Sequence, residues 1–520
     1  MQKKLSLQLT PEEAADPQRV RKAIAASCGL PATAVTGHHL LRSSIDARGR
    51  QTWMIQQVLA FLNEPYTKRE VTQFTFQEVH HAVHQVLIVG AGPAGLFAAL
   101  KLIENGIRPI LLERGKDVRA RRRDLARINK EGVVDPDSNY CFGEGGAGTY
   151  SDGKLYTRST KRGDVNRILQ LFYRFGAAEN ILYEAHPHIG TNKLPQIITA
   201  LREQILSCGG IIHFEQRVAG IQVKDGKAKG IRLSDGTTIE GDAVILATGH
   251  SARDIFRSLA AEGIPVQAKP FALGVRIEHP QVLIDRAQYH CLSRSPYLPP
   301  AAYSLVTQVA ERGVFSFCMC PGGIIAPAAT SPGEIVVNGW SPSKRNNPFA
   351  NSGMVVTIEP EDFSALNEKF GALSALQFQQ EVEQKAFAYG GGQLKAPAQR
   401  MTDFITKKTS TSLPKCSYLP GLTSAPLNEV LPGFVYEALS KGFQDFGKKI
   451  KGYLTEEAVV VATESRTSSP VRIPRDAVSL EHPTVHRLYP CGEGAGYAGG
   501  IISAAMDGER VAEQLIRVLK

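Results

Sequence analysis

The sequence predicts a mixed α/β protein whose doubly wound parallel sheet is assembled from two distant stretches of chain. Residues 84–115, "HQVLIVGAGPAGLFAALKLIENGIRPILLERG", have the pattern of a strand, a glycine-rich turn, a helix and a second strand. Residues 242–250, "DAVILATGH", contain another apolar run bounded by glycine, which is typical of a buried parallel strand. The final residues 483–520 again follow the order strand, glycine-rich turn, helix.

The length and composition of the chain are consistent with this prediction. A chain of 520 residues is too long for one hydrophobic core, so we expect more than one domain. Hydrophobic residues make up 43% and charged residues 21%, which is typical of a globular protein. We find no apolar run of about 18 residues that would suggest a membrane span, and no signal peptide. The eight irregularly spaced cysteines indicate free thiols and a cytoplasmic location.

Residues 1–82 are predicted to form a separate small module. "KLSLQL" alternates like a strand, and "PQRVRKAIAASCGL" has helical spacing that ends at Gly29. Two further stretches, 34–46 and 52–63, flank the turn-like "ARGR" as the strands of a hairpin would. The order β-α-β-β favours a ferredoxin-like module. It contains no aromatic-rich RNA-binding segment, so we expect it to pack against the main body.

The first glycine-rich turn predicts a bound dinucleotide. Gly90, Gly92 and Gly95 follow a predicted strand and open a predicted helix, and Glu113 ends the next strand about 20 residues on. Gly90 would permit a tight turn, Gly92 a close approach to the diphosphate, and Gly95 close helix packing. The helix N-terminus would face the diphosphate with free N–H groups, and Glu113 would accept hydrogen bonds from the ribose.

The elements that follow complete this domain. Residues 192–210 have helical spacing and lead into the strand "IIHFE". Three short alternating stretches cover 218–241, with Asp-Gly at two of their turns. The buried strand that ends in "ATG" at Ala247–Gly249 comes next.

The C-terminal residues indicate which dinucleotide, NAD or FAD, the first glycine-rich turn would bind. Gly494, Gly496 and Gly499 also satisfy G-x-G-x-x-G, but the remaining residues leave no room for a second strand and its acid. A strand that ends in Gly492–Glu493 before a glycine-rich turn and a helix instead resembles the closing motif of FAD proteins. In that motif an acid contacts the ribityl chain and a helix N-terminus approaches the flavin. Glu stands here where Asp is more common.

At this point the chain resembles glutathione-reductase-type FAD-binding proteins and, more narrowly, the bacterial family of uncharacterised FAD-dependent dehydrogenases. Five stretches carry the narrower resemblance, which extends over nearly the whole chain: "NYCFGEGGAGTYSDGKL" (139–155), "KPFALGVRIEHP" (269–280), "FSFCMCPGG" (315–323), "NGWSPSKRNNPFAN" (338–351) and "CGEGAGYAGGIISAAMDG" (491–508).

The resemblance implies a glutathione-reductase-type FAD-binding fold built from residues 83–254 and 481–520. An α+β substrate domain of residues 255–480 would be inserted in it. The predicted FAD-binding residues are Gly90, Gly92, Pro93, Ala94, Gly95, Glu113, Arg114, Gly145, Gly146, Ala147, Val218, Thr248, Gly249, Gly492, Glu493, Gly494, Ala495, Gly500 and Ile501.

The segment 143–155 is expected to run beside the isoalloxazine, as the corresponding segment does in related flavoproteins. Its small residues would let backbone N–H groups approach the ring. Asp152 and Lys154 are the polar side chains predicted to face that site. On the resemblance alone, substrate-orienting roles are expected for Arg276, Arg345 and Asn351.

Cys318 and Cys320 invite a redox interpretation, but a disulfide across one intervening residue would be strained, and two cysteines do not make a zinc site. We therefore favour packed strand residues that can line the substrate cavity. The stretch "RARRRDLARINK" is rich in arginine, and helical spacing places Arg119, Arg122 and Arg123 roughly on one side. We expect this side to be a solvated face from which one arginine turns toward the diphosphate. The histidines to test are His250 and His279.

The predicted function is an FAD-dependent oxidoreductase in which a hydride passes between flavin N5 and an unknown small molecule. NAD(P)H would visit transiently, because no second complete dinucleotide unit is found. The catalytic residues stay unassigned, and no metal is predicted. The alternative is an RNA-binding flavoprotein that acts on tRNA, motivated by the net charge of +10 and the N-terminal module. A flavin with a structural or sensing role is a third possibility.

Overall fold

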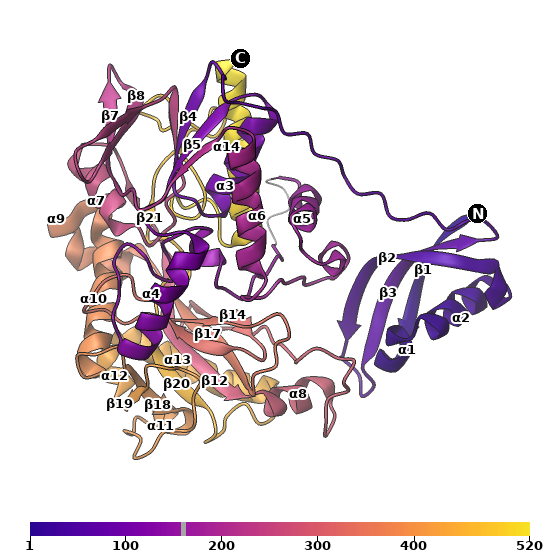
Figure 1. Ribbon diagram of the computed structural model, residues 1–520. Helices are drawn as coiled ribbons and strands as arrows, with labels where there is room; N and C mark the ends of the chain where they lie inside the picture. The colour runs from indigo at the N-terminus through magenta and orange to yellow at the C-terminus, as the bar shows by residue number, and fades with distance from the viewer. Residues whose placement is uncertain (158–162) are drawn as a thin grey trace.

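A five-stranded parallel sheet organises one half of the molecule (Figure 1). The computed structural model describes residues 1–157 and 163–520. The strand order is β22-β10-β4-β5-β6, so a strand from the chain end completes a sheet begun four hundred residues earlier. The strands are β4 (Gln85–Val89), β5 (Arg108–Leu112), β6 (Ile211–His213), β10 (Ala243–Leu246) and β22 (Leu488–Pro490).

Both faces of this sheet are buried, which explains the continuous apolar runs in its strands. Val86 and Ile88 of β4 belong to one core cluster, whereas Leu87 and Val89 belong to another. On one face α3 (Pro93–Glu104) packs against α14 (Ile501–Leu519) and α6 (Leu194–Ser207) (Figure 1). The other core cluster includes residues of a three-stranded meander and of α7, which packs on its first strand. The bounds are β7 (Val218–Lys224), β8 (Lys227–Leu233), β9 (Thr238–Glu240) and α7 (Arg253–Ala261).

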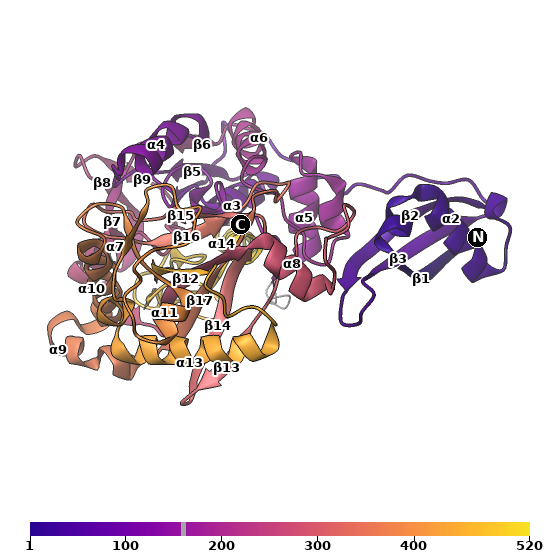
Figure 2. The ribbon, with the colours of Figure 1, turned by 90° about the horizontal axis from the view of Figure 1, so that it is seen from below.

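A seven-stranded, mostly antiparallel sheet organises the other half, in the order β13-β14-β17-β12-β20-β18-β19. Helix α13 (Gly433–Lys449) packs across β12, β13, β14 and β17 (Figure 2). The strands are β12 (Phe271–Pro280), β13 (Val306–Val309), β14 (Arg312–Cys320), β17 (Phe349–Ile358), β18 (Ala396–Arg400), β19 (Leu422–Ser424) and β20 (Val459–Glu464).

The described residues therefore confirm a mixed α/β protein. The predicted boundary after residue 254 falls inside α7. The other elements of the body are α4 (Val118–Glu131), α5 (Val165–Arg174), β11 (Gln267–Ala268), α8 (Gln281–Tyr289), β15 (Ile324–Pro327), β16 (Val337–Trp340), α9 (Asn367–Phe370), α10 (Ser374–Tyr389), α11 (Met401–Ile405), α12 (Leu427–Val430) and β21 (Val471–Arg472). No helix in the described part of the chain is long and apolar enough to cross a membrane.

The N-terminal module has its own small core and a three-stranded antiparallel sheet of order β1-β3-β2. Thr10 forms a capping box with Glu13, and Gly29 ends the second helix in the left-handed region at φ 64°. The elements are β1 (Gln2–Leu9), α1 (Pro11–Ala15), α2 (Pro17–Cys28), β2 (Val35–Asp46) and β3 (Trp53–Leu62). These elements cover the first four of the six ferredoxin-like elements, because no helix and no further strand follow β3 before the main body begins at β4.

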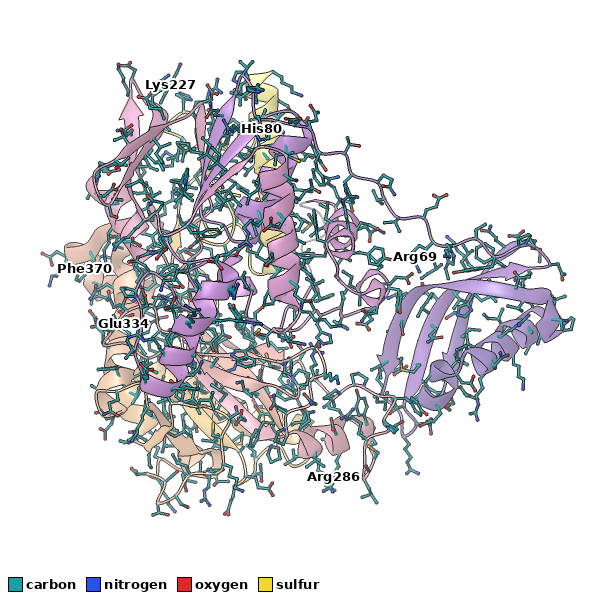
Figure 3. The ribbon with its side chains drawn as sticks, in the orientation of Figure 1. Arg69, His80, Lys227, Arg286, Glu334 and Phe370 are labelled. Atoms are coloured by element: carbon teal, nitrogen blue, oxygen red, sulfur yellow. The ribbon has the colours of Figure 1, made fainter. Side chains whose placement is uncertain are left out.

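The module projects from the body instead of packing a face against it, contrary to the sequence-based expectation (Figures 1 and 2). Arg69, in the extended segment that joins the two parts, donates to the Leu40 carbonyl and pairs with Glu179 at 3.0 Å (Figure 3). Backbone hydrogen bonds join Ser43 of β2 to Tyr183 and Ala185. Ser295, in the segment after α8, also donates to Glu12 of α1 at 2.8 Å, so the body touches the module at a few separate points.

Candidate functional site

A cleft of about 650 Å³ lies between the two halves, within the size range of small-molecule and cofactor sites. Its walls come from the first glycine-rich turn, the ends of β5 and β10, the start of β7, the loop 141–157 and the start of α14. Phe317, Cys318, Asn338, Arg466 and Thr467 supply the wall on the side of the seven-stranded sheet.

The three glycines of the first turn differ in what surrounds them. A Cβ at Gly90, where φ is 105°, would lie 2.5 Å from the Ala247 carbonyl oxygen. A Cβ at Gly95 would collide with the Gly90 carbonyl oxygen. At Gly92 the nearest heavy atom would be 4.0 Å away, and Gly92 lines the cleft. Packing therefore requires the first and third glycines, whereas the second leaves free space beside the helix N-terminus.

Helix α3 begins at this free space without a side-chain cap. Its first N–H groups have no partner within the helix, so they are available to an anion in the cleft. The turn at Gly146 lies directly opposite, because a Cβ on Gly146 would be 3.2 Å from Gly92 Cα. The N–H of Gly145 donates to the Ala91 carbonyl at 2.8 Å and fixes the two turns together.

Glu113 is a buried carboxylate that joins three segments at one end of the cleft. Its Oε2 accepts from Ala91 N at 3.0 Å, and its Oε1 accepts from Gly115 N and Gly143 N, both at 2.9 Å. A carboxylate has about four acceptor positions, so one remains for a ligand hydroxyl in the cleft. Glu113 thus organises the glycine turns as well as facing the cleft.

The arginine that lines this end of the cleft comes from the end of β5 and not from the predicted arginine-rich helix. Arg114 lines the cleft, and its guanidinium pairs with Asp137 at 2.6 Å and Asp254 at 3.0 Å. Arg119, Arg122 and Arg123 are exposed and do not line the cleft, so no arginine of that helix face turns toward it. The buried arginine of α4 is Arg121, which donates to the carbonyls of Asn139, Tyr140 and Glu144.

The C-terminal turn meets the same cleft from the opposite side. Glu493 lines it, and His250 Nδ1, a buried atom without a hydrogen-bond partner, lies 3.4 Å from Glu493 Oε1. Gly500, with φ 134°, lines the cleft at the start of α14, and a Cβ there would meet nothing within 4 Å. The N-termini of α3 and α14 therefore open onto one cleft.

A buried ion pair that the sequence analysis missed supports this turn. Asp507 Oδ2 accepts from Gly492 N at 2.8 Å, and Asp507 pairs with Arg475 at 2.6 Å. The guanidinium of Arg475 also stacks 3.8 Å from the centre of the Tyr497 ring. Asp507 lies on the apolar face of the predicted terminal helix, and that pattern could have revealed it. Arg475 carries no comparable signal.

The structure brings most of the predicted cofactor residues to this cleft. Those that line it are Gly90, Gly92, Pro93, Ala94, Glu113, Arg114, Gly146, Ala147, Val218, Thr248, Gly249, Glu493, Gly500 and Ile501. Gly95, Gly145, Gly492, Gly494 and Ala495 stand behind the lining. Gly494, for example, packs so tightly on the backbone of Gly249 that a Cβ would collide with it.

The far end of the cleft contains Asp152 and Lys154, the two polar residues predicted to face the site. Asp152 is buried and pairs with Arg345 at 2.7 Å. Although burial opposes its charge, Arg345 and Lys154 hold the pKa of Asp152 below its usual value. Lys154 Nζ donates to the Met319 carbonyl and lies 3.8 Å from Cys318 Sγ.

The residues expected to orient a substrate do not line the cleft. Arg276 is fully buried, pairs with Glu464 at 2.5 Å and donates to Asn351 Oδ1 at 2.7 Å. The guanidinium of Arg345 forms an ion pair with Asp152. His279 is also buried, with Nε2 at 2.8 Å from the Tyr453 carbonyl, and burial lowers its pKa to about 4. Each of these groups has a protein partner within the sheet region, although Asn351 Nδ2 and His279 Nδ1 are buried without a hydrogen-bond partner.

Three family models match the chain. "FAD-dependent protein, C-terminal domain-like" matches residues 270–467, "FAD binding domain" matches residues 83–127, and a domain of unknown function matches residues 1–61. The first two confirm the prediction of FAD as the cofactor. The free space at Gly92, Gly249 and Gly500 fits a nucleotide that lies close to the backbone, and so does His250 Nδ1, which has no hydrogen-bond partner.

Two curated relatives differ greatly in coverage. An uncharacterised protein of Clostridium beijerinckii is 46% identical over 434 residues, which cover 83% of this chain and 80% of that protein. Thiamine thiazole synthase of Aeropyrum pernix is 28% identical over 204 residues, which cover 36% of this chain and 63% of that protein.

Solved structures resemble the chain only distantly. The tetracycline destructase Tet(51) is 14% identical, with 84% of this chain and 82% of that chain covered and a TM-score of 0.34. CtdE in complex with FAD is 14% identical, with coverages of 83% and 85% and a TM-score of 0.31. Scores this low do not establish a shared fold.

Proposed function

We propose that the chain, which belongs to the same family as the Clostridium beijerinckii relative and matches two FAD-related family models, is an FAD-dependent oxidoreductase acting on a small molecule. A hydride would pass between that molecule and the flavin N5. The observation that carries the proposal is the meeting of Gly92 and Glu493, about 400 positions apart, in the lining of one cleft.

Different parts of FAD would be bound by different residues along the cleft. The N-terminus of α3 and the space at Gly92 would hold the diphosphate, and the remaining acceptor position of Glu113 would hold a ribose hydroxyl. Glu493 and the N-terminus of α14 would hold the ribityl chain and the near edge of the ring. When bound, FAD supplies two-electron redox chemistry at its ring.

The loop 146–154 would position the ring end of the site. Small residues at Gly146, Ala147 and Gly148 allow backbone N–H groups to approach a flat ring. Asp152 and Lys154 place a carboxylate and an ammonium at the edge of the same space, where they would orient a substrate and move a proton. The seven-stranded sheet covers this end and limits access of water.

The same arrangement supports a glutathione-reductase-type fold with an inserted substrate domain. Strand β22 returns beside β10, after the residues of the seven-stranded sheet, to complete the parallel sheet. The described residues contain one unit of strand, glycine-rich turn, helix and second strand in which an acid, Glu113, follows the second strand. A nicotinamide cofactor would therefore bind transiently at the ring end, where Lys154 lies.

The matched families give no support to the RNA-binding alternative. It rests on the net charge of +10 and on an incomplete ferredoxin-like module whose matched family has no known function. Retention of RNA by the purified protein, weakening as salt rises, is the result that would revive it.

The proposal is tested by anaerobic stopped-flow mixing of the purified yellow protein with NADH, NADPH and a panel of small alcohols, aldehydes and acids. Bleaching of the flavin absorbance by at least one reductant, followed by its return with an oxidised partner, is the expected result. A flavin that never changes oxidation state would contradict the proposal and favour a structural or sensing role.

A further inference from the structure

Two thiols and an ammonium meet at the far end of the cleft, in a group that the FAD-binding residues do not use. Cys318 lines the cleft, whereas Cys320 is fully buried behind it. Lys154 Nζ lies 3.8 Å from Cys318 Sγ and 3.9 Å from Cys320 Sγ. Arg276 Nη2 lies 3.8 Å from Cys320 Sγ. Two cations therefore flank the two sulfurs.

A bulge in β14 produces this placement. The pairing of β14 with β17 runs from Phe317 opposite Gly353 to Cys320 opposite Asn351, so one residue of β14 is extra. Cys318 has φ 47°, a left-handed conformation that costs about 1 kcal/mol or more in a residue other than glycine. Its carbonyl is free to accept from Arg276 Nη2 at 2.7 Å and from Cys320 Sγ at 3.2 Å.

We propose that Cys318 is a thiolate nucleophile of this cleft that adds to the carbonyl carbon of a small aldehyde or ketone, with Lys154 as the proton donor. This substrate class rests on the proposed oxidoreductase function. In the step an S–C bond forms and the C=O π bond breaks, and a proton moves from Nζ to the oxygen. No electrons leave the thiol or the carbonyl compound, so the addition needs no oxidant.

The local charges support a thiolate at Cys318 and a thiol at Cys320. The neighbouring Cys320 side chain, together with Lys154 and Arg276, lowers the pKa of Cys318 well below its usual value despite burial. The same interaction and burial raise the pKa of Cys320. Burial acts to lower the pKa of Lys154, but the two sulfurs and Asp152 outweigh it and raise that pKa above its usual value. The other charged or titratable neighbours are Arg345 behind Asp152, Glu464 behind Arg276, and His188, which lies opposite Lys154 in a β-bridge and whose pKa is lowered by burial.

The distance between sulfur and ammonium favours direct addition to a carbonyl. The oxygen of the resulting adduct is two bonds from the sulfur, so an ammonium 3.8 Å from that sulfur can reach it. In conjugate addition the charged oxygen would lie several bonds further away. Asp152 Oδ2, 3.9 Å from Lys154 Nζ, and the Met319 carbonyl keep the ammonium in place.

The thiolate is tested by treating the FAD-loaded protein with iodoacetamide and measuring the alkylation rate of each cysteine by peptide mass spectrometry. Cys141 is the matched control, because it lines the same cleft while its Sγ contacts the Ala328 carbonyl. Between pH 8.5 and pH 6 an ordinary thiol loses thiolate, and therefore rate, by about 150-fold. Cys318 is expected to lose less than about threefold. Equal losses at both cysteines would overturn the proposal.

Lys154→Met should slow alkylation of Cys318 at pH 6 at least about tenfold, whereas Lys154→Arg retains most of the rate. The flavin absorbance spectrum of each variant shows whether the cleft is intact. A Lys154→Met variant with a normal spectrum and an unchanged rate would also overturn the proposal.

The carbonyl assignment is tested by competition on the same protein. Propanal should protect Cys318, but not Cys141, from iodoacetamide, and 1-propanol should protect neither. A reactive Cys318 without protection by propanal would refute the assigned substrate class. Both experiments measure covalent modification of a sulfur and not flavin reduction. Their failure is therefore distinct from the failure of the proposed hydride transfer.

Discussion

Gly92→Val separates the folding role of the first glycine-rich turn from its binding role. Gly92 has φ −76° and ψ −177°, which valine adopts readily, and its Cβ would come no closer than 4.0 Å to a neighbouring heavy atom. Replacing glycine at a helix N-cap by valine costs about 1 kcal/mol or less. The variant should therefore fold.

Binding should fail, because the new side chain occupies the space between Gly92 and Gly146 at the N-terminus of α3. Displacing the diphosphate from two N–H donors would cost about 1.5–3 kcal/mol for each. The sum corresponds to a rise in the Kd for FAD of roughly two to four orders of magnitude.

The assay is calorimetric titration of flavin-stripped protein with FAD, with circular dichroism to verify the fold. Gly90→Val is the contrasting variant, because φ of 105° and the approach of Cβ to Ala247 should prevent normal folding. A Gly92→Val protein that purifies yellow and fully loaded would refute the reasoning about this cleft.

Three further predictions concern the residues around the glycine turns. Arg475→Met leaves Asp507 buried without its partner and should lower the free energy of unfolding by about 3–5 kcal/mol in urea titrations. The double variant with Asp507→Asn should recover part of the lost stability, since an amide oxygen can still accept from Gly492 N. A loss below about 1 kcal/mol in the single variant would contradict a stabilising role for the ion pair. Glu113→Gln leaves one of three backbone donors without an acceptor and should weaken FAD binding roughly 10- to 100-fold; unchanged affinity would argue against this role. Burial raises the pKa of Glu144 from 4.5 to about 7, so the folded state retains a proton that the unfolded chain loses in this window. Stability therefore falls by up to about 3 kcal/mol as the pH rises from 4.5 to 7, and Glu144→Gln should flatten the profile of Tm against pH, whereas parallel profiles would contradict the assignment.

The part of the fold that local pattern determines was predictable. The apolar runs of β4, β5 and β10 and the helical spacing of α3 are properties of short stretches, and the parallel sheet follows from them. The pairing of the Gly92 and Glu493 turns was predictable only from motif chemistry, because no local pattern relates residues 400 positions apart.

Buried polar partners account for most of what was missed. Arg276 and Glu464 pair across 188 positions, so neither residue signals its burial locally. Arg121 was accessible to prediction, because it lies with Val118, Leu125 and Ile128 on the buried stripe of α4. The ferredoxin-like prediction for residues 1–82 assumed a complete fold from its first four elements. The stretch 63–84 is largely extended and supplies neither the helix nor the strand that would follow β3 in that fold.

The position of β22 at the edge of the parallel sheet constrains the order of events during synthesis. Ribosomes add about 5–20 residues per second, so β10 would wait roughly 12 to 50 s before β22, some 240 residues later, emerges. Throughout that interval the outer edge of β10 presents unpaired backbone groups, which are a template for association with other chains. Nascent chains would therefore be exposed to such association during this interval, and the cleft would be complete only after β22 and the turn that follows it have emerged.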